Sequence, residues 1–266
     1  MSLLEKTKFL LRKYRIFPKK RLGQHFMVDS SIFQHMAECA ALARDDVVLD
    51  IGAGLGFLTR FLAEKCETVL AVEVDLKLVW VLRELFKDLP NVVVVEGDVF
   101  KVRVPPFNKV VSIPPYNISS ALIQWLFSKD FDCAVLVFQK EFANRLLASV
   151  GSEDYGWLTV LAYHHFEVEL FDEVPKWMFY PQPEIDSVIV RLKPRVPPPF
   201  HVKDEAFFRR LVQTLFTQRN RKVRNAVQSF IKKCAFAEKS TIPFHERRVR
   251  ELAPEDFGEL ANVLSS

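Results

Sequence analysis

The sequence predicts an α/β protein in which a mostly parallel sheet is followed by a small helical C-terminal domain. Three observations favour this fold class. Apolar, β-branched segments alternate with helix-like segments over the first two thirds of the chain, which is typical of a parallel sheet covered on both faces. A proline-rich stretch, Pro194–Pro199, then interrupts the pattern and has the composition of a linker. Beyond it, apolar residues recur at helical spacing.

Two helices precede the predicted sheet. Residues 3–15 have the pattern of a short basic helix that ends before Pro18, because proline cannot continue a helix. Residues 30–43 place apolar side chains at helical spacing, with Ser30 or Ser31 as the N-cap. Both helices therefore lie ahead of the first strand.

Strands and helices then alternate. The predicted parallel strands are short runs rich in Val, Ile and Leu, at residues 47–52, 68–75, 91–98, 109–113 and 133–139. The helices that follow strands are predicted at residues 56–65, 76–88, 118–128 and 141–149. Two later segments, 166–174 and 186–194, are predicted to pair as antiparallel strands at the end of the same sheet.

The C-terminal part of the chain is predicted to be helical. One apolar stripe occupies residues 207–216 and a second occupies residues 223–231. The basic residues near the second stripe lie mainly off it and can face solvent or RNA. We accordingly expect a basic N-terminal arm (1–22), an α/β domain (23–193) and a helical basic domain (194–266).

Charged residues are strongly segregated along the chain. Residues 1–22 carry a net charge of +7 and residues 191–250 carry +12, whereas residues 23–190 carry −11 and residues 251–266 carry −4. An acidic body flanked by two basic segments favours a polyanion held from two sides, and nucleic acid is the expected partner. Contacts with phosphates, which position the nucleic acid without reading its bases, are predicted for Arg219, Arg221, Lys222 and Arg224.

Several classes of protein are excluded. No apolar run approaches the ~18 residues that a membrane span needs, and the N-terminus lacks a signal-peptide pattern, so we expect a soluble cytoplasmic protein. His164 and His165 are adjacent but have no carboxylate or cysteine at ligand spacing, so no metal site is predicted. The cysteines lack any C-x-x-C pair and are expected to be reduced thiols: Cys39, Cys66, Cys133 and Cys234.

Glycine and acidic residues follow three successive predicted strands. Gly52 and Gly54 form a tight turn after the first strand, where the backbone can approach a ligand closely. Glu73 ends the second strand, where it can accept hydrogen bonds from two ribose hydroxyls, and Asp98 ends the third, where it can accept from an adenine amine. Phe57 stands where a dinucleotide fingerprint needs its third glycine. The crevice is therefore predicted to bind S-adenosylmethionine.

Six motifs, in order along nearly the whole chain, resemble those of the ribosomal RNA adenine N6,N6-dimethyltransferases. The residues of several motifs are more similar to archaeal than to bacterial members. The motifs are KKRLGQHF (19–26), DIGAGLGFLT (50–59), the acids Glu73 and Asp98, PYNISS (115–120), FYPQPEIDS (179–187) and LFTQRNRKVR (215–224). The resemblance implies a Rossmann-like methyltransferase domain and a helical C-terminal domain. It also implies a monomer that moves methyl groups from S-adenosylmethionine to N6 of two adjacent adenosines near the 3′ end of small-subunit rRNA.

The same resemblance implies the site residues. The implied cofactor contacts are Gln24, His25, Met27, Gly52, Gly54, Glu73, Asp98 and Ile113. The implied catalytic positions are Ile113, Pro114, Tyr116 and Phe179. Of these, Tyr116 and Phe179 would sandwich the target base, which must be flipped out of its stack to be modified.

One departure from the family pattern bears on the chemistry. The family motif has Asn, an aliphatic residue, Pro and an aromatic residue where this sequence has IPPY (113–116). The lone pair of adenine N6 is delocalised into the ring, and the family Asn oxygen and a backbone carbonyl accept the amine hydrogens so that the nitrogen can pyramidalise. Ile113 has no acceptor, which leaves the Pro114 carbonyl. Ser112 or Asn117 could substitute, although strand alternation points Ser112 away from the side of Ile113.

Three functions stay open on these grounds. The first is an active rRNA adenine dimethyltransferase with reduced or rearranged recognition of the amine. The second is a ribosome-assembly factor that binds pre-small-subunit rRNA and S-adenosylmethionine but methylates weakly or only once. The third, a small-molecule methyltransferase, is disfavoured by the two basic segments and by the FYPQPEIDS motif.

Overall fold

The computed structural model describes residues 1–231 and 242–265. The chain forms two compact units. Unit 1 comprises residues 1–143 and 169–194, and unit 2 comprises residues 144–168 and 195–266. This division differs from the expected one in two ways. The N-terminal arm is part of unit 1, and residues 144–168 belong with the C-terminal helices because they contain a helix that packs on them.

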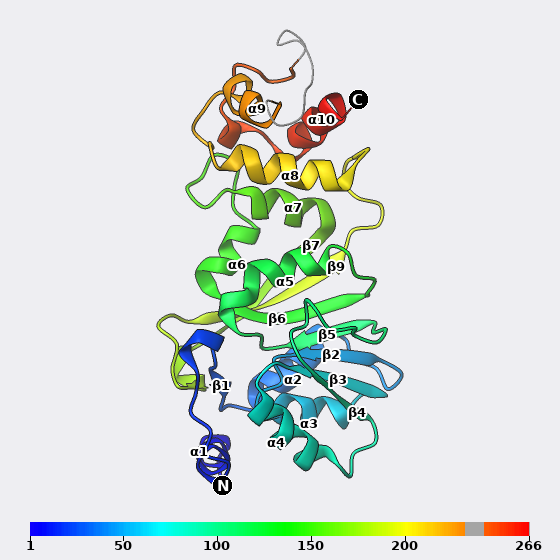
Figure 1. Ribbon diagram of the computed structural model, residues 1–266, viewed down its shortest axis with the longest axis vertical. Helices are drawn as coiled ribbons and strands as arrows, with labels where there is room; N and C mark the ends of the chain where they lie inside the picture. The colour runs from blue at the N-terminus through cyan, green and yellow to red at the C-terminus, as the bar shows by residue number, and fades with distance from the viewer. Residues whose placement is uncertain (232–241, 266) are drawn as a thin grey trace. The chain divides into compact units, whose positions relative to one another are not determined.

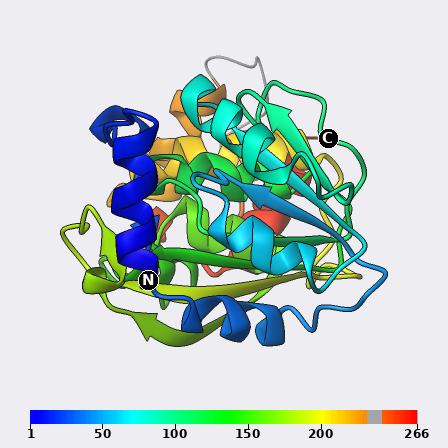
Figure 2. The same ribbon diagram turned by 90° about the horizontal axis from the view of Figure 1, so that it is seen from below.

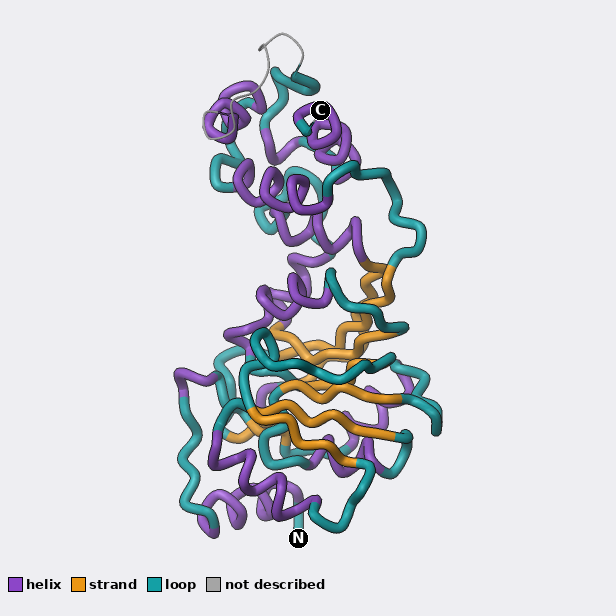
Figure 3. Tube along the Cα trace, turned by 45° about the vertical axis from the view of Figure 1, so that its right-hand side comes forward, coloured by secondary structure: helices purple, strands orange, loops and turns teal. Residues whose placement is uncertain are grey.

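A seven-stranded sheet, in the order β4-β3-β2-β5-β6-β9-β7, forms the centre of unit 1 (Figures 1 and 3). Its strands are β2 (Val47–Ile51), β3 (Thr68–Glu73), β4 (Val92–Glu96), β5 (Lys109–Ser112), β6 (Cys133–Gln139), β7 (Phe166–Val174) and β9 (Ser187–Pro194). β2 to β6 pair in parallel, and β9 is antiparallel to β6. The predicted segments 166–174 and 186–194 thus lie together at the end of the sheet. The strand order reverses between β2 and β5, which is where open α/β sheets bind ligands.

The helices of unit 1 pack on the sheet and on one another. They are α1 (Leu3–Lys13), α2 (Ser31–Cys39), α3 (Phe57–Ala63), α4 (Leu76–Phe86), α5 (Ser119–Leu126) and α6 (Lys140–Leu146), the last of which continues into unit 2. α2 and α3 share one buried cluster with strand residues such as Val48 and Val111. Leu11 of α1 lies in another cluster with Leu78 of α4. Figure 2 shows α1, in dark blue, at the left of the view and α2 below the strands.

Most predicted elements are present but shorter at their ends. The helix predicted at 56–65 begins one residue later, because Gly56 has φ 76° and caps it from the left-handed region. The strand predicted at 68–75 ends at Glu73, because Asp75 turns the chain and caps α4 with its side chain. Both differences arise from turn geometry and not from the apolar pattern.

A second, two-stranded sheet was not predicted. β1 (Phe26–Met27) pairs antiparallel with β8 (Phe179–Tyr180), and both segments are too short to show a strand pattern. The pairing joins the KKRLGQHF motif to the FYPQPEIDS motif, which are far apart in the sequence. It places residues implied in cofactor binding beside residues implied in binding the target base.

The described part of unit 2 is helical apart from the beginning of β7. Its helices are α7 (Trp157–His165), α8 (Glu205–Phe216), α9 (Val223–Ile231) and α10 (Pro254–Leu264), and α8 contacts the other three. The stripe predicted at 207–216 is buried. Helix α7 was missed because its residues are apolar on nearly every side, so they show no amphipathic stripe.

Cys39, Cys66 and Cys133 are free and buried, and Cys234 lies outside the described residues. Burial raises the pKa of the Cys66 thiol to about 11, so this group is an inert thiol at neutral pH. In the ranges that the structure describes, no helix is long and apolar enough to span a membrane.

Candidate active site

A cavity opens at the point where the strand order reverses. It is lined by segments that follow β2, β3, β4 and β5, by the N-terminal segment 22–26 and by Phe179 of β8. Five of the six motifs thus contribute to one cavity. Most of the implied site residues line it: Gln24, His25, Gly52, Gly54, Glu73, Asp98, Ile113, Pro114, Tyr116 and Phe179. Met27 instead lines a smaller cavity that shares His25 and Ile113 with the first.

The glycine turn after β2 leaves no room for a side chain. Gly52 and Gly54 have φ values of 77° and 61°, in the left-handed region. A Cβ at Gly52 would lie 2.8 Å from Cδ of Pro115, and one at Gly54 would lie 3.3 Å from the Phe26 ring. The bare backbone therefore faces the cavity, and this close approach suits a nucleoside-containing cofactor.

Glu73 ends β3 with a carboxylate that the backbone holds in place. One oxygen accepts hydrogen bonds from the N–H groups of Val74 and Asp75, both at 2.8 Å, and the other accepts from the Gly54 N–H at 2.9 Å. The residue is 5% exposed, so burial raises its pKa, and the three N–H donors oppose that rise. Remaining lone pairs can accept from ribose hydroxyls, which fits the role predicted for this residue.

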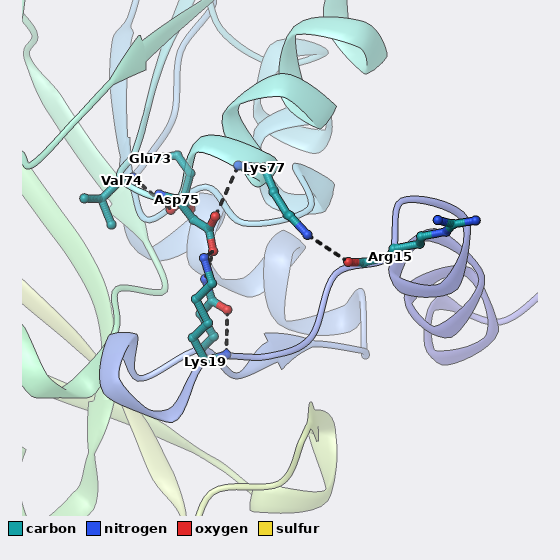
Figure 4. Close-up of polar contacts among 7 residues, drawn as sticks. Arg15, Lys19, Glu73, Val74, Asp75 and Lys77 are labelled. Carbon is teal, nitrogen blue, oxygen red and sulfur yellow. Dashed lines mark hydrogen bonds and ion pairs between the residues drawn. The ribbon is translucent and has the colours of Figure 1, made fainter.

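Asp75, two residues further on, ties the N-terminal segment to this strand end (Figure 4). Its buried carboxylate pairs with Lys19 Nζ at 2.7 Å and accepts a hydrogen bond from Gln24 Nε2 at 3.0 Å. Lys77 Nζ donates in turn to the Arg15 carbonyl at 3.2 Å. Burial alone would raise the pKa of Asp75, but the hydrogen bonds from Lys19 and Gln24 outweigh burial and lower it.

We call Lys19, Gln24, Asp75 and Lys77 the Asp75 cluster. Sequence reasoning missed the role of Asp75, although a carboxylate two residues after a strand-end acid and just ahead of a helix is an N-cap signal. The cluster also changes the interpretation of Gln24. Its amide is engaged by Asp75 and by the Lys19 N–H at 2.9 Å, so Gln24 shapes the wall of the cavity through the fold of the segment.

A second acid lies beneath the glycine turn. Asp50 of β2 is 1% exposed, and its carboxylate accepts a hydrogen bond from the Thr59 hydroxyl at 2.7 Å. Burial raises the pKa of Asp50 to about 7, with a further contribution from the negative charge of Glu73. Asp50 lines the smaller cavity, so its protonation bears on the cofactor end of the site.

Asp98 lies in the turn after β4, where its side chain is partly exposed. One carboxylate oxygen accepts the Phe100 N–H at 3.1 Å, and the other lies 3.5 Å from Lys101 Nζ. Val74, which sequence reasoning passed over, lines the same cavity and is 47% exposed. An exposed apolar side chain directly after a strand-end acid offers an apolar contact to a base, and this exception to burial is the signal that could have found it.

The expected pair of aromatic rings is present in a different arrangement. Tyr116 and Phe179 meet edge to face, with ring centroids 6.2 Å apart at 68°, and Phe179 is 1% exposed. A base stacked between two parallel rings needs a separation of about 7 Å, twice the carbon contact distance. In this structure the two rings contact each other, and the sandwich around a target base stays a prediction. The Tyr116 hydroxyl lies 2.7 Å from the Ser187 hydroxyl, which orients the ring.

Ile113 lies where the cavity meets the apolar core. Ser112 cannot replace the missing acceptor, because its buried hydroxyl donates to the Ile51 carbonyl at 2.6 Å and accepts the Ile51 N–H at 3.0 Å. Asn117 is exposed and donates to the Arg21 carbonyl at 3.3 Å. Among the described residues, no N–H donates to the Pro114 carbonyl, so that acceptor is available.

The four predicted phosphate contacts lie in unit 2 and differ in their engagement. Arg219 donates to the carbonyls of Ser152 and Glu153, both at 2.7 Å, and so holds a loop. Lys222 and Arg224 both pair with Glu246. Arg221 is exposed and donates to the side chain of Gln218, three residues away.

The two adjacent histidines acquire an acidic neighbour in three dimensions. His164 Nε2 lies 2.9 Å from a Glu205 carboxylate oxygen, and His165 Nε2 lies 3.8 Å from the other. The sequence shows no carboxylate at ligand spacing from these histidines, because Glu205 comes from α8, which packs on α7. These three residues could hold a metal ion by their spacing. The pKa of His165 is lowered to about 4, mainly by burial and to a smaller extent by the charge of the neighbouring His164.

The sheet is Rossmann-like, as predicted. Its strand order and the crevice at the strand ends define the class of methyltransferases that use S-adenosylmethionine. A profile described as "Ribosomal RNA adenine dimethylase" matches residues 17–265, so the chain belongs to that family.

Relatives and solved structures agree with this membership. "Probable ribosomal RNA small subunit methyltransferase A" of Methanosarcina acetivorans is 40% identical over 96% of each chain. Its counterpart in Methanopyrus kandleri is 40% identical over 97% of this chain and 91% of its own. A dimethyladenosine transferase from Plasmodium falciparum superposes with a TM-score of 0.73 at 28% identity, over 88% of this chain and 95% of its own. The 23S rRNA methyltransferase ErmE superposes with a TM-score of 0.64 at 28% identity, over 91% of this chain and 100% of its own.

Proposed function

We propose that this enzyme transfers methyl groups from S-adenosylmethionine to N6 of two adjacent adenosines near the 3′ end of small-subunit rRNA during ribosome biogenesis. The observation that carries the proposal is that the glycine turn and Glu73 share one cavity with the IPPY segment and Phe179. A cofactor end and a base end therefore open into the same space. The names of the relatives that match over nearly the full chain support the small subunit as substrate.

The residues of the cavity divide into two groups by chemistry. Glu73 and Asp98 would hold the ribose and the adenine of the cofactor, and the bare backbone at Gly52 would lie against it. Bound S-adenosylmethionine supplies a methyl group that its sulfonium makes electrophilic. Tyr116 and the Pro114 carbonyl would orient the target adenine, the ring by stacking and the carbonyl by accepting an amine hydrogen.

This orientation is where the protein contributes to the rate. The N6 lone pair must leave conjugation with the ring before it can form the new N–C bond. Formation of that bond would break the bond between the methyl group and sulfur, whose electrons would stay with sulfur, and the nitrogen would release one hydrogen to solvent as a proton. An acceptor that holds an amine hydrogen favours the reactive geometry, and losing one such oriented contact costs on the order of 10²–10³ in rate in other enzymes.

A second candidate function follows from Ile113. Its side chain packs against the apolar core, and the neighbouring Ser112 hydroxyl is already engaged by Ile51. Weakened amine recognition would leave a ribosome-assembly factor that binds pre-small-subunit rRNA and methylates weakly or only once. In both cases we propose that the partner is the small-subunit rRNA in its precursor particle, and that a monomer acts on it in the cytoplasm.

Single-turnover methylation of unmodified small ribosomal subunits with labelled S-adenosylmethionine distinguishes these functions. Mass spectrometry of the released nucleosides is expected to show N6,N6-dimethyladenosine at two adjacent positions. Monomethyladenosine alone, or subunit binding without methylation, would favour the assembly factor. If the protein neither binds nor methylates the subunit, both proposed functions are overturned.

A further inference from the structure

We infer that the Nε2 atom of His25 is the acceptor that replaces the missing side-chain oxygen at position 113, and that it binds a hydrogen of the target amine. The inference rests on the proposed function and adds a catalytic residue to it. It starts from the hydrogen bond that fixes the imidazole ring. His25 Nδ1 lies 2.7 Å from the Pro181 carbonyl oxygen.

This contact determines the tautomer. A carbonyl oxygen only accepts hydrogen bonds, so Nδ1 must carry the proton that it donates. In the neutral ring the other nitrogen, Nε2, then has an unprotonated lone pair and is an acceptor. No described residue donates to it, so the lone pair is available to a ligand.

The acceptor also lies beside the right residues. The imidazole packs against Tyr116 with ring centroids 5.8 Å apart at 29°, and Tyr116 is the ring expected to contact the target base. His25 and Ile113 both line the two cavities of the site. The imidazole of His25 therefore lies in the same part of the site as the Ile113 side chain, which has no acceptor.

The alternatives are weaker on the same observations. The Ser112 hydroxyl is buried and makes both of its hydrogen bonds to Ile51. Asn117 is exposed, and its amide is turned to the Arg21 carbonyl of the N-terminal segment. Pro114 supplies its carbonyl, which leaves one amine hydrogen unmatched in the first methyl transfer. An acceptor at His25 would complete the pair.

His25→Phe tests the inference, because it keeps a flat ring against Tyr116 and removes the acceptor. We expect the single-turnover rate on unmodified small subunits, at saturating S-adenosylmethionine, to fall on the order of 10²-fold with the cofactor Kd within about threefold of wild type. Ile113→Asn in the His25→Phe background should restore the rate to within about tenfold of wild type. His25→Gln keeps an acceptor at similar reach and should lose less than His25→Phe.

His201→Phe makes the same substitution at an exposed histidine outside the cavity, so it is the matched control and should retain the wild-type rate within a few-fold. Three results would overturn the inference: an unchanged rate in His25→Phe, a loss that Ile113→Asn and His25→Gln both leave in place, or a loss that appears only in the cofactor Kd. The proposed function fails separately, because in that case the wild-type enzyme itself transfers no methyl to the small subunit.

Discussion

At the scale of single residues, the backbone at Gly52 connects the cofactor turn to the IPPY segment. Its φ of 77° is unfavourable for any residue with a Cβ, and that Cβ would meet Pro115 at 2.8 Å. The proline ring cannot move aside as a flexible side chain would, so the strain falls on both segments of the site.

Gly52→Ala should therefore reduce stability and cofactor binding together. We expect a loss of about 1–3 kcal/mol in the free energy of unfolding and at least a tenfold rise in the Kd for S-adenosylmethionine. Gly151→Ala is a matched control, since Gly151 has φ 82° but no atom within 4 Å of a built Cβ. It should lose about 1 kcal/mol and bind the cofactor normally. Equal behaviour of the two variants in calorimetry would contradict this account.

Asp50 gives a prediction in pH. Its pKa of about 7 in the folded protein exceeds the value of about 4 expected when unfolded, so between these values the folded state keeps a proton that the unfolded state releases. Stability contributed by this proton is present below pH 4 and is lost as pH rises towards 7. Relative to wild type, Asp50→Asn should gain about 2–4 kcal/mol between pH 4 and pH 8.

Urea unfolding at several pH values measures this difference. The Asn side chain can still accept the Thr59 hydrogen bond, so the comparison isolates the charge. Asp45→Asn, at an exposed carboxyl close in sequence, serves as control and should run parallel to wild type. A pH dependence of Asp50→Asn identical to that of wild type would show that Asp50 does not titrate in this range.

At the scale of elements, the Asp75 cluster joins three pieces of the chain: the end of β3, the start of α4 and the N-terminal segment. The same N-terminal segment forms one wall of the cavity over residues 22–26. The position of that wall therefore depends on a buried carboxylate and the lysine that neutralises it, and not on the helical propensity of the segment.

Lys19→Met should weaken cofactor binding without touching the cofactor site itself. The variant removes the 2.7 Å ion pair and leaves the Asp75 charge with only its hydrogen bonds. Because Lys19 is 37% exposed, we expect a modest cost of about 1–2 kcal/mol in stability and a rise of about three- to tenfold in the cofactor Kd. Lys20→Met, at the exposed next residue, should keep wild-type affinity. If Lys19→Met binds the cofactor with wild-type affinity, the Asp75 cluster does not determine the position of the cavity wall.

At the scale of the whole molecule, charge segregation predicts how RNA binding responds to salt. Residues 1–22 carry a net charge of +7 and residues 191–250 carry +12, against −11 for residues 23–190. Of the four predicted contacts, Arg219 holds a loop through two backbone carbonyls. Arg221 and Arg224 are exposed and their guanidinium groups bond to side chains, so these two are the targets.

Neutralising both, as Arg221→Gln with Arg224→Gln, should weaken binding to small-subunit rRNA. It should also reduce the slope of log K against log salt by about 1.4–1.8, while cofactor affinity stays unchanged. Lys87→Gln, at an exposed cation within the net-acidic segment, is the control and should keep the wild-type slope. An unchanged slope in the double variant, measured by filter binding, would remove these arginines from the RNA contact.

The strands around the cofactor end and the residues that follow them could be predicted from the sequence. Gly52, Glu73 and Asp98 are recognisable because apolar periodicity and turn chemistry act over a few neighbouring residues. The same local logic placed the helix stripe at 207–216. It missed α7, whose apolar residues are buried on nearly every side and so show no stripe.

The contacts that complete the site join residues far apart in the chain, and only the tertiary structure decided them. Lys19 reaches Asp75, His25 reaches Pro181, and Glu205 reaches the histidines of α7. Each depends on which elements pack together and on the distance between two side-chain atoms. Local pattern carries no information about either, because hydrogen bonds and ion pairs act over a few ångströms of space whatever the separation along the chain.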